Sequence, residues 1–378
     1  NILGSGWSSW SIATFTTFLA CFVKLSTKSS SAAKLFNAVH KAQVSWNRIR
    51  PLLGSVKEEK DGKEWGSEDL EVRDVTFAYP DGKKVLEHVS FSAKPGEIIG
   101  VTGPVACGKS TLGRTLLCLN EPTAGEILFQ GTDIAKLGKK QMKAVRPKMQ
   151  MIFQDPYASL DPRMNVLQLI EEPIKVNHKD MSKADVTARA KEMMELVGLA
   201  KRLEGSYPHE LDGGRRQRIG IARALSLNPD FIVCDEPVSA LDVSIQAQIL
   251  NLMQDLQDEL DLTYMFITHD LSVVKHFSNQ IMVMYLGQMV EMAPTEVLFK
   301  NPVHPYTKAL LSAIPIPDPD YPMERIMMKG EITSPIDPEP GCRFAKRCPY
   351  ATEGCTSNEM TLKEMEPGHF VSCRMVQE

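Results

Sequence analysis

A short glycine-bounded stretch of the chain has the residue types needed to hold a chain of phosphates. It reads GPVACGKST and runs from Gly103 to Thr111. Gly103 and Gly108 permit backbone angles that turn consecutive N–H groups toward an anion, and the start of a helix adds a favourable dipole. We expect Lys109 to reach the β and γ phosphates of a nucleotide, Ser110 to place its hydroxyl on Mg²⁺, and Thr111 to support the α-phosphate.

A pair of acidic residues at the end of an apolar run supplies a second group of candidate residues. The run reads FIVCDEP and spans Phe231–Pro237. If its four apolar residues form a buried strand, Asp235 emerges at the carboxyl end, where doubly wound sheets bind ligands. Asp235 is then expected to hold Mg²⁺ directly or through water, and Glu236 to polarise an attacking water as general base. Together the two motifs predict hydrolysis of a phosphoanhydride.

The elements that must position these motifs follow an α/β pattern from Leu70 to about Pro315. A β-rich run, Glu97–Thr102, stands directly before the phosphate loop, and a helix over Lys109–Leu119 follows it. Further buried strands are predicted at Met149–Phe153, Phe231–Cys234, Tyr264–Thr268 and Gln280–Tyr285, and helices at Met181–Val197, Arg215–Leu225 and Val243–Leu260. The pattern predicts a largely parallel sheet with a ligand site at its carboxyl edge.

Composition narrows the class of protein. The chain has 378 residues, of which 43% are hydrophobic and 24% charged, the balance of a folded globular protein of two or three domains. Collagen, coiled-coil and disordered classes are excluded. A net charge of -4 leaves no overall basic excess for nucleic acid, so we expect no nucleic-acid partner.

The predicted domains follow from shifts in composition along the chain. Residues 1–25 form an uncharged apolar segment up to Lys24, either a membrane-helix remnant or an interfacial segment. Residues 26–68 read as an amphipathic connector and linker. We expect the catalytic domain at 69–314, with a helical subdomain at about 157–226. A Pro-rich linker and a four-cysteine module occupy 315–378.

Further motifs, together with the first two and in this order along the chain, resemble the ATP-binding cassette of ABC transporters. They are Tyr79 in FAYP, Gln154 in MIFQDP, the loop LDGGRRQR at Leu211–Arg218, SALD at Ser239–Asp242, and His269 in ITHD. The resemblance implies a P-loop NTPase fold of the ABC nucleotide-binding type, with a mixed sheet and a helical subdomain, that hydrolyses ATP.

The resemblance also implies a role for each motif residue. Tyr79 stacks on adenine, His269 bonds the γ-phosphate, and Gln154 touches Mg²⁺ or water. Catalytic residues are Glu236, His269 and Lys109; the Mg²⁺ ligands are Ser110, Gln154 and Asp235. The residues expected to contact nucleotide are Tyr79, Gly103, Cys107, Gly108, Lys109, Ser110, Thr111, Gln154, Asp212, Gly213, Gly214 and Asp242. Taken singly, Tyr79 is as often a packing residue and His269 more often a structural one.

The signature loop departs from the family's usual Ser-Gly-Gly-Gln and reads Asp212-Gly213-Gly214-Arg215. In the family this loop caps the ATP held by a partner domain. A carboxylate near the γ-phosphate repels it by roughly 4 kcal/mol per charge pair at about 4 Å and an effective dielectric of about 20. Arg215 can bridge Asp212 at the i,i+3 spacing or meet the phosphate itself. We therefore expect unequal ATP sites; the alternative is that Asp212 only caps its helix.

The last part of the chain is similar to the ATPases of dipeptide, oligopeptide and nickel importers. The similarity lies in NPVHPYTKALLSAIP, Asn301–Pro315, and in the tail that begins GCRFAKRCPYATEGC. It implies peptide import driven by this subunit and a second ABC ATPase subunit, as a heterodimer. It also implies two transmembrane permease subunits, an extracytoplasmic peptide-binding protein, and a peripheral location on the cytoplasmic face of the membrane. His304 and Tyr306 are expected to be structural.

Four cysteines close to the C-terminus could form a metal site. They are Cys342, Cys348, Cys355 and Cys373, without a conveniently spaced histidine. An all-cysteine set suits zinc or a [4Fe-4S] cluster. The similarity to the importer tail favours [4Fe-4S], with zinc as the alternative; free thiols or disulfides also remain open.

The first portion is similar to a different branch of the same family. Trp7 to about Gly113 resembles the last membrane helix, connector and early ATPase domain of an exporter half-transporter. The alternatives to a peptide importer are therefore an exporter-type ABC subunit, a non-transport cassette ATPase, and a partner that does not hydrolyse ATP.

Overall fold

The computed structural model describes residues 70–314, 326–330, 341–357 and 360–376, together with Thr17 and Phe22. The chain divides into two compact units, residues 1–64 and 65–378, and every element below belongs to the second. The apolar segment at 1–25 and the connector at 26–68 lie outside the described residues, apart from those two positions. So does most of the Pro-rich linker that starts at 315.

The strands are β1 (Leu70–Ala78), β2 (Lys84–Ala93), β3 (Ile98–Thr102), β4 (Ala124–Phe129), β5 (Thr132–Asp133), β6 (Met149–Ile152), β7 (Phe231–Asp235), β8 (Thr263–Ile267), β9 (Gln280–Tyr285), β10 (Gln288–Pro294), β11 (Lys363–Glu366) and β12 (His369–Val371). The α-helices are α2 (Lys109–Leu116), α3 (Lys139–Val145), α4 (Val166–Asn177), α5 (Lys183–Leu196), α6 (Gly213–Leu225), α7 (Val243–Leu260), α8 (Leu271–Phe277), α9 (Thr295–Lys300), α10 (Pro305–Ser312) and α11 (Gly354–Ser357). Short 3-10 turns are η1 (Ile134–Lys136), η2 (Arg146–Lys148), η3 (Lys201–Leu203), η4 (Pro208–Glu210), η5 (Ala345–Arg347) and η6 (Arg374–Val376).

An eight-stranded sheet forms the centre of the unit, in the order β11-β12-β10-β9-β3-β8-β7-β6. The strands β6, β7, β8, β3 and β9 run parallel, and β10, β12 and β11 continue antiparallel. Every residue of β3, β7 and β8 is buried, as expected for apolar strands covered on both faces. The prediction of a largely parallel sheet is confirmed, and the carboxyl ends of β3, β7 and β8 share one edge.

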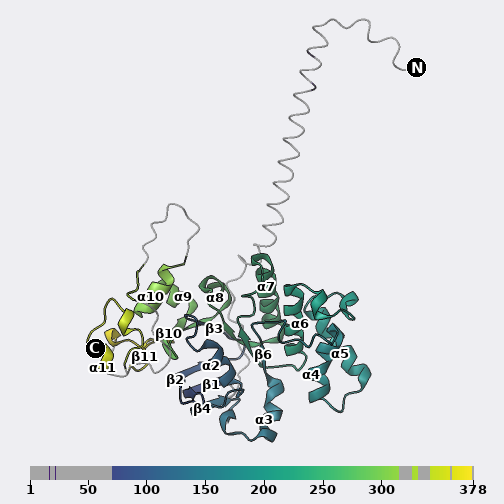
Figure 1. Ribbon diagram of the computed structural model, residues 1–378, viewed down its shortest axis with the longest axis horizontal. Helices are drawn as coiled ribbons and strands as arrows, with labels where there is room; N and C mark the ends of the chain where they lie inside the picture. The colour runs from purple at the N-terminus through teal and green to yellow at the C-terminus, as the bar shows by residue number, and fades with distance from the viewer. Residues whose placement is uncertain are drawn as a thin grey trace. The chain divides into compact units, whose positions relative to one another are not determined.

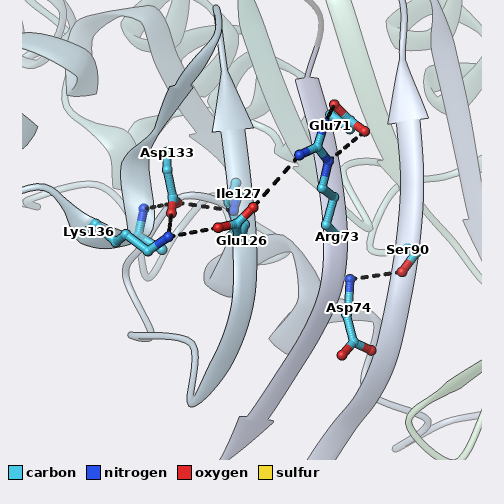
Figure 2. Close-up of polar contacts among 9 residues, drawn as sticks. Glu71, Arg73, Asp74, Ser90, Glu126, Ile127, Asp133 and Lys136 are labelled. Atoms are coloured by element: carbon cyan, nitrogen blue, oxygen red, sulfur yellow. Dashed lines mark hydrogen bonds and ion pairs between the residues drawn. The ribbon is translucent and has the colours of Figure 1, made fainter.

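A smaller antiparallel sheet, in the order β2-β1-β4-β5, packs against α2 and the central sheet through alternating apolar residues such as Val72, Val75 and Leu86. Its other face is polar (Figure 2). There Arg73 pairs with the carboxylates of Glu71 and Glu126. Such exposed pairs add little stability, so this face reads as solvated surface.

The helices α4, α5 and α6 pack together beside the β6 end of the central sheet (Figure 1). Their apolar residues join those of α7 in one core cluster. Asn165 caps α4 by accepting a hydrogen bond from the N–H of Gln168, and Asp212 caps α6 in the same way. This helical group is therefore fixed to the strand that leads into the Gln154 loop.

The C-terminal segment, which we define as residues 326–330, 341–357 and 360–376, lies at the other end of the sheet (Figure 1). Its strand β12 pairs with β10, Glu291 opposite Val371. His304 is buried and accepts a hydrogen bond from the N–H of Tyr306 at the start of α10, and Tyr306 is buried as well. The structural roles predicted for this histidine and tyrosine are confirmed. None of the helices among the described residues is long and apolar enough to cross a bilayer.

Candidate active site

The phosphate loop connects β3 to α2 through residues 103–108. Gly103 has φ 152° and Gly108 has φ 98°, in the region that favours glycine. A Cβ on Gly103 would lie 2.2 Å from the carbonyl oxygen of Met284, so no larger residue fits there. Ala106 also adopts a left-handed conformation, with φ 63°. The loop is therefore folded tightly at both ends and strained in its middle.

Lys109 is buried at the first position of α2. Its ammonium donates to the carbonyl oxygens of Gly103 at 2.6 Å and Pro104 at 3.2 Å. No carboxylate among the described residues lies within ion-pair distance of it. A buried cation held only by neutral oxygens attracts an anionic ligand to the loop. Cys107 is buried within the same loop, and Thr111 is half-buried in the first turn of α2.

Ser110 and Asp235 meet although they are far apart in the sequence. The Ser110 hydroxyl donates to Oδ1 of Asp235 at 2.7 Å, and Asp235 is only 2% exposed at the carboxyl end of β7. Burial raises the pKa of the Asp235 carboxyl, and the Ser110 hydroxyl acts in the opposite direction. A hydroxyl next to a carboxylate is an oxygen pair of the kind that Mg²⁺ prefers. These two residues therefore fit the predicted cation.

Glu236, directly after β7, contacts side chains that follow the two strands on either side of it, β6 and β8. Its carboxylate accepts from the amide of Gln154 at 3.0 Å and lies 3.4 Å from Nδ1 of His269. Glu236 itself has φ 46°, and its N–H donates to the carbonyl of Ile267 at 3.0 Å. A non-glycine residue in this conformation is strained, as is common where a side chain must be aimed at a ligand. Three predicted site residues are thus brought together beside Asp235.

The signature loop places Asp212 at the start of α6. Its carboxylate accepts from the N–H of Arg215 at 2.8 Å and lies 3.3 Å from the Arg215 guanidinium. Both side chains are about half exposed. A Cβ on Gly214 would lie 2.6 Å from Ile245, and one on Gly213 would lie 2.9 Å from Leu241, so the loop is packed against the region of α7. Asp212 is therefore a helix cap, and it also forms the predicted i,i+3 ion pair with Arg215.

Tyr79 and Asp242 lie at the surface. Tyr79 is 43% exposed and meets the ring of Phe77 edge-on at 5.1 Å, at the start of the turn that leads into β2. Asp242 is exposed and precedes α7. Within the described part of the chain, no hydrogen bond or ion pair joins the side chains of Tyr79, Asp212 or Asp242 to residues 103–111.

The four cysteines of the C-terminal segment come close to one another without a metal-binding arrangement. The N–H of Cys342 donates to the carbonyl of Cys355 at 2.7 Å, and none of the seven described cysteines forms a disulfide. Burial raises the pKa of Cys342 to about 11 and also raises those of Cys348 and Cys373. Among the described residues, no group of three or more His, Cys, Asp or Glu is arranged to hold a metal ion. The structure therefore does not support the predicted cluster or zinc.

Two polar residues that the sequence did not single out line a cavity of about 110 Å³ between β6, α4 and α6. Gln217 is 1% exposed and its amide nitrogen has no partner among the described residues. Arg223 donates to the carbonyl of Ser159, while its Nε has no hydrogen-bond partner in the part of the chain that the structure describes. The signal that could have found them is a polar residue on the apolar face of the predicted helix Arg215–Leu225.

Comparison with protein families gives two matches. Residues 86–239 match the family model described as ABC transporter, and residues 290–355 match that described as Oligopeptide/dipeptide transporter, C-terminal region. The chain is 50% identical over 312 residues to the putative oligopeptide transport ATP-binding protein YkfD of Bacillus subtilis, covering 81% of this chain and 95% of that protein. It is 49% identical over 302 residues to the dipeptide transport ATP-binding protein DppF of Haemophilus influenzae, covering 80% and 92%.

Solved structures of cassette proteins are similar to the same part of the chain. One is a dimeric post-hydrolysis state of the ATP-binding cassette MJ0796 bound to ADP and Pi, with TM-score 0.55 and 30% identity over 60% of this chain and 98% of that one. Another is cbiO1 from Clostridium perfringens, with TM-score 0.56 and 25% identity over 61% and 90%. The exporter-like interpretation of Trp7 to about Gly113 gains no support from these comparisons, and most of that portion lies outside the described residues.

Proposed function

The chain belongs to the ABC transporter family, among the ATP-binding subunits of oligopeptide and dipeptide transporters, and we propose how its residues divide the work of that subunit. It is an ATP-hydrolysing subunit of a peptide importer. One arrangement carries the residue assignment: Ser110, shortly after the phosphate loop, contacts Asp235, and the next residue, Glu236, contacts Gln154 and His269.

The phosphate loop binds the anionic end of the nucleotide. Lys109 exchanges the loop carbonyls for the β and γ phosphates, because a charged acceptor forms a stronger hydrogen bond with an ammonium than a neutral one does. The backbone around Gly103, Cys107, Gly108 and Thr111 surrounds the phosphates. Tyr79 offers an exposed ring face to the base.

Ser110 and Asp235 hold Mg²⁺, with Gln154 as a third oxygen ligand. When bound, the ion neutralises charge that develops on the phosphate oxygens. Asp235 is suited to this role because burial raises its pKa, and a nearby positive charge stabilises the ionised form of such a carboxylate.

Glu236 orients the attacking water and accepts its proton. The water oxygen forms a bond to the γ-phosphorus, the bond from that phosphorus to the bridging oxygen breaks, and ADP leaves. His269, which already lies next to the Glu236 carboxylate, donates a hydrogen bond to the γ-phosphate. Gln154 links the same carboxylate to the loop that leads into the helical group.

The partners follow from the family. A second ABC ATPase subunit faces this one as a heterodimer, two permease subunits span the membrane, and an extracytoplasmic protein delivers peptides. The subunit lies peripherally on the cytoplasmic face of the membrane. Asp212, Gly213, Gly214 and Asp242 face the partner's ATP, and the Asp212–Arg215 pair weakens that second site. Equal hydrolysis at both sites of a vanadate-trapped heterodimer would contradict this asymmetry.

The four cysteines of the C-terminal segment remain a predicted [4Fe-4S] site, with zinc as the alternative. The proposal rests on the similarity of this tail to that of the importer ATPases and on the backbone hydrogen bond from Cys342 to Cys355. Iron content, visible absorbance and a reduced-state EPR signal of anaerobically purified protein test the cluster. An iron-free sample that carries zinc would reject it.

The domain limits also remain a proposal: an apolar segment at 1–25, a connector at 26–68, the ATPase domain at 69–314 with its helical subdomain at about 157–226, and the tail at 315–378. Limited proteolysis of the full chain tests them, because cleavage should fall within 26–68 and soon after 315.

The experiment that tests the function measures uptake of a labelled dipeptide into vesicles that hold the complete transporter. We expect Lys109→Ala to abolish both ATP turnover and uptake. Lys143→Ala, which removes an exposed lysine of α3, is the matched control and should leave both unchanged. ATP turnover that survives in Lys109→Ala would refute the assignment of the phosphate loop.

A further inference from the structure

A series of hydrogen bonds joins the C-terminal segment to the phosphate loop through β2 and the turn at Gly287. The guanidinium of Arg343 donates to the carboxylate of Glu87 in β2, across 256 positions of sequence. The N–H of Glu87 donates to the carbonyl of Gly287 at 3.0 Å, and the N–H of Gly287 donates to the carbonyl of Cys107 at 2.9 Å. Arg343 is thus connected to the phosphate loop through one ion pair and two backbone bonds.

The backbones along this path are packed without space between them. Gly287, in the turn between β9 and β10, has φ 82°, and a Cβ there would lie 2.2 Å from the carbonyl oxygen of Val85. A Cβ on Gly108 would lie 3.1 Å from the same oxygen and from Leu86. Because β2, the turn and the phosphate loop touch through main-chain atoms, a shift of β2 has to move the loop.

Arg343 fixes β2 at this point through a buried charge. Its side chain is 7% exposed, that of Glu87 is 15% exposed, and Nε and Nη1 of Arg343 have no partner among the described residues. An arginine stays charged at all ordinary pH values, so its position depends on the Glu87 carboxylate. The second cation on that carboxylate, Lys84, lies 3.6 Å away with its side chain 62% exposed, which makes it a weak partner.

We propose that Arg343 is a positioning residue for nucleotide binding: through Glu87 and the Gly287 turn it holds the phosphate loop in the conformation that binds MgATP. The docked C-terminal segment thereby sets the affinity of the subunit for its nucleotide. This inference rests on the proposed function and adds a residue outside the motifs that bind nucleotide. It also gives the C-terminal segment a role that does not depend on a metal.

The test compares variants of the full chain by equilibrium binding of MgATP. We expect Arg343→Gln and Glu87→Gln each to raise the Kd about tenfold, within the usual range of coupling between sites. The double variant should be no weaker than the worse single variant, because both changes remove the same link. Arg343→Lys, which keeps the charge, should recover part of the affinity.

Two controls remove a positive charge without breaking the path. Lys84→Gln removes the exposed cation from the same carboxylate, and Arg347→Gln removes a guanidinium from the same segment. Both should keep the Kd within twofold of wild type. In the complete transporter, the KM for ATP should rise in Arg343→Gln while kcat stays within twofold, and amide exchange should quicken in residues 103–108.

The outcomes separate this inference from the proposed function. Wild-type chain that fails to bind MgATP would reject the proposed function itself. Wild-type binding together with an unchanged Kd in a folded Arg343→Gln or Glu87→Gln variant would overturn the inference alone. If Arg343→Gln does not fold, Glu87→Gln decides, because it removes the carboxylate that holds Arg343 while keeping the size of the side chain. Additive effects in the double variant would also overturn it.

Discussion

Lys109 and Asp235 at the carboxyl edge of the sheet are buried, and no described residue of opposite charge forms a hydrogen bond with either: the ammonium donates to carbonyl oxygens, and the carboxylate accepts from a hydroxyl. In and beside the C-terminal segment the buried carboxylates have side-chain partners: the Arg343 guanidinium contacts Glu87, and the His369 ring lies 2.8 Å from Glu291. The same chain therefore leaves charge uncompensated in one region and gives it a side-chain partner in another. We take buried charged side chains without an oppositely charged contact as the mark of the ligand site. Buried carboxylates with a side-chain partner we take as groups that stabilise the fold.

This contrast predicts that Glu236→Gln affects the rate far more than the fold. The amide keeps the size of the side chain and can still bond Gln154 and His269, but it cannot accept a proton from water. We expect ATP turnover in the complete transporter to fall by about 10² to 10⁴, the usual range for loss of a general base. MgATP affinity and thermal stability should stay close to those of wild type. Turnover within twofold of wild type would contradict the role.

Glu291→Leu is expected to affect the stability of the fold far more than the rate of ATP hydrolysis, because it removes a buried carboxylate that has several partners. Glu291 accepts from the N–H groups of Val303 and His304 and contacts His369. Each buried donor left without an acceptor costs about 1 to 3 kcal/mol, so the free energy of unfolding should drop by several kcal/mol in all. Denaturant unfolding measures this. Glu366→Gln, on exposed β11, is the control and should change little. If the Glu291→Leu variant is as stable as wild type, the contacts of Glu291 do not stabilise the fold.

Asp235→Asn should stabilise the nucleotide-free chain while removing ATPase activity. Burial raises the pKa of Asp235 in the folded state, so its contribution to stability is present below the ordinary Asp pKa of about 3.9 and is lost as pH rises through the folded value. The variant should therefore melt a few degrees higher near pH 7.5, and the gain should shrink as pH falls toward 4. If Asp235→Asn melts at a lower temperature than wild type at neutral pH, the buried Asp235 carboxylate does not destabilise the nucleotide-free chain.

The smallest effect concerns His304, whose N–H donates to Glu291. Burial lowers its pKa to about 3, below the ordinary value of 6.5, so the stability it contributes is present above pH 6.5 and lost as pH falls toward 3. His304→Asn keeps a cap for α10 without this titration. The variant should lose less melting temperature than wild type between pH 7.5 and 5.5 in matched buffers. Parallel pH profiles would show that His304 does not resist protonation.

The sequence predicted the parallel strands and the phosphate loop because their signals are local. β3, β7 and β8 are mostly apolar runs, and recognisable motifs stand at their carboxyl ends: the phosphate loop follows β3, and Asp235 ends β7. The relative register of these strands follows from their lengths, because parallel strands of similar length end at the same edge of the sheet.

Other features were not predicted, because they depend on contacts with distant residues and not on the pattern of the neighbouring sequence. Strand β11, KEME, is exposed throughout and is a strand only because β12 lies beside it. Helix α4 contains Pro173, which argues against a helix, yet packing of Leu169 and Ile170 outweighs it. The pairing of Arg343 with Glu87 joins residues 256 positions apart, and nothing in the sequence around either residue indicates the other as its partner.

Titration of MgATP into the wild-type chain and into Lys109→Ala, with and without excess EDTA, tests the central claim most directly. We expect saturable binding at millimolar nucleotide or below, weaker binding when Mg²⁺ is removed, and loss of binding in Lys109→Ala. Wild-type chain that does not saturate in this range, or a Lys109→Ala variant that binds equally well, would contradict the claim that the uncompensated charge of this loop exists to hold nucleotide.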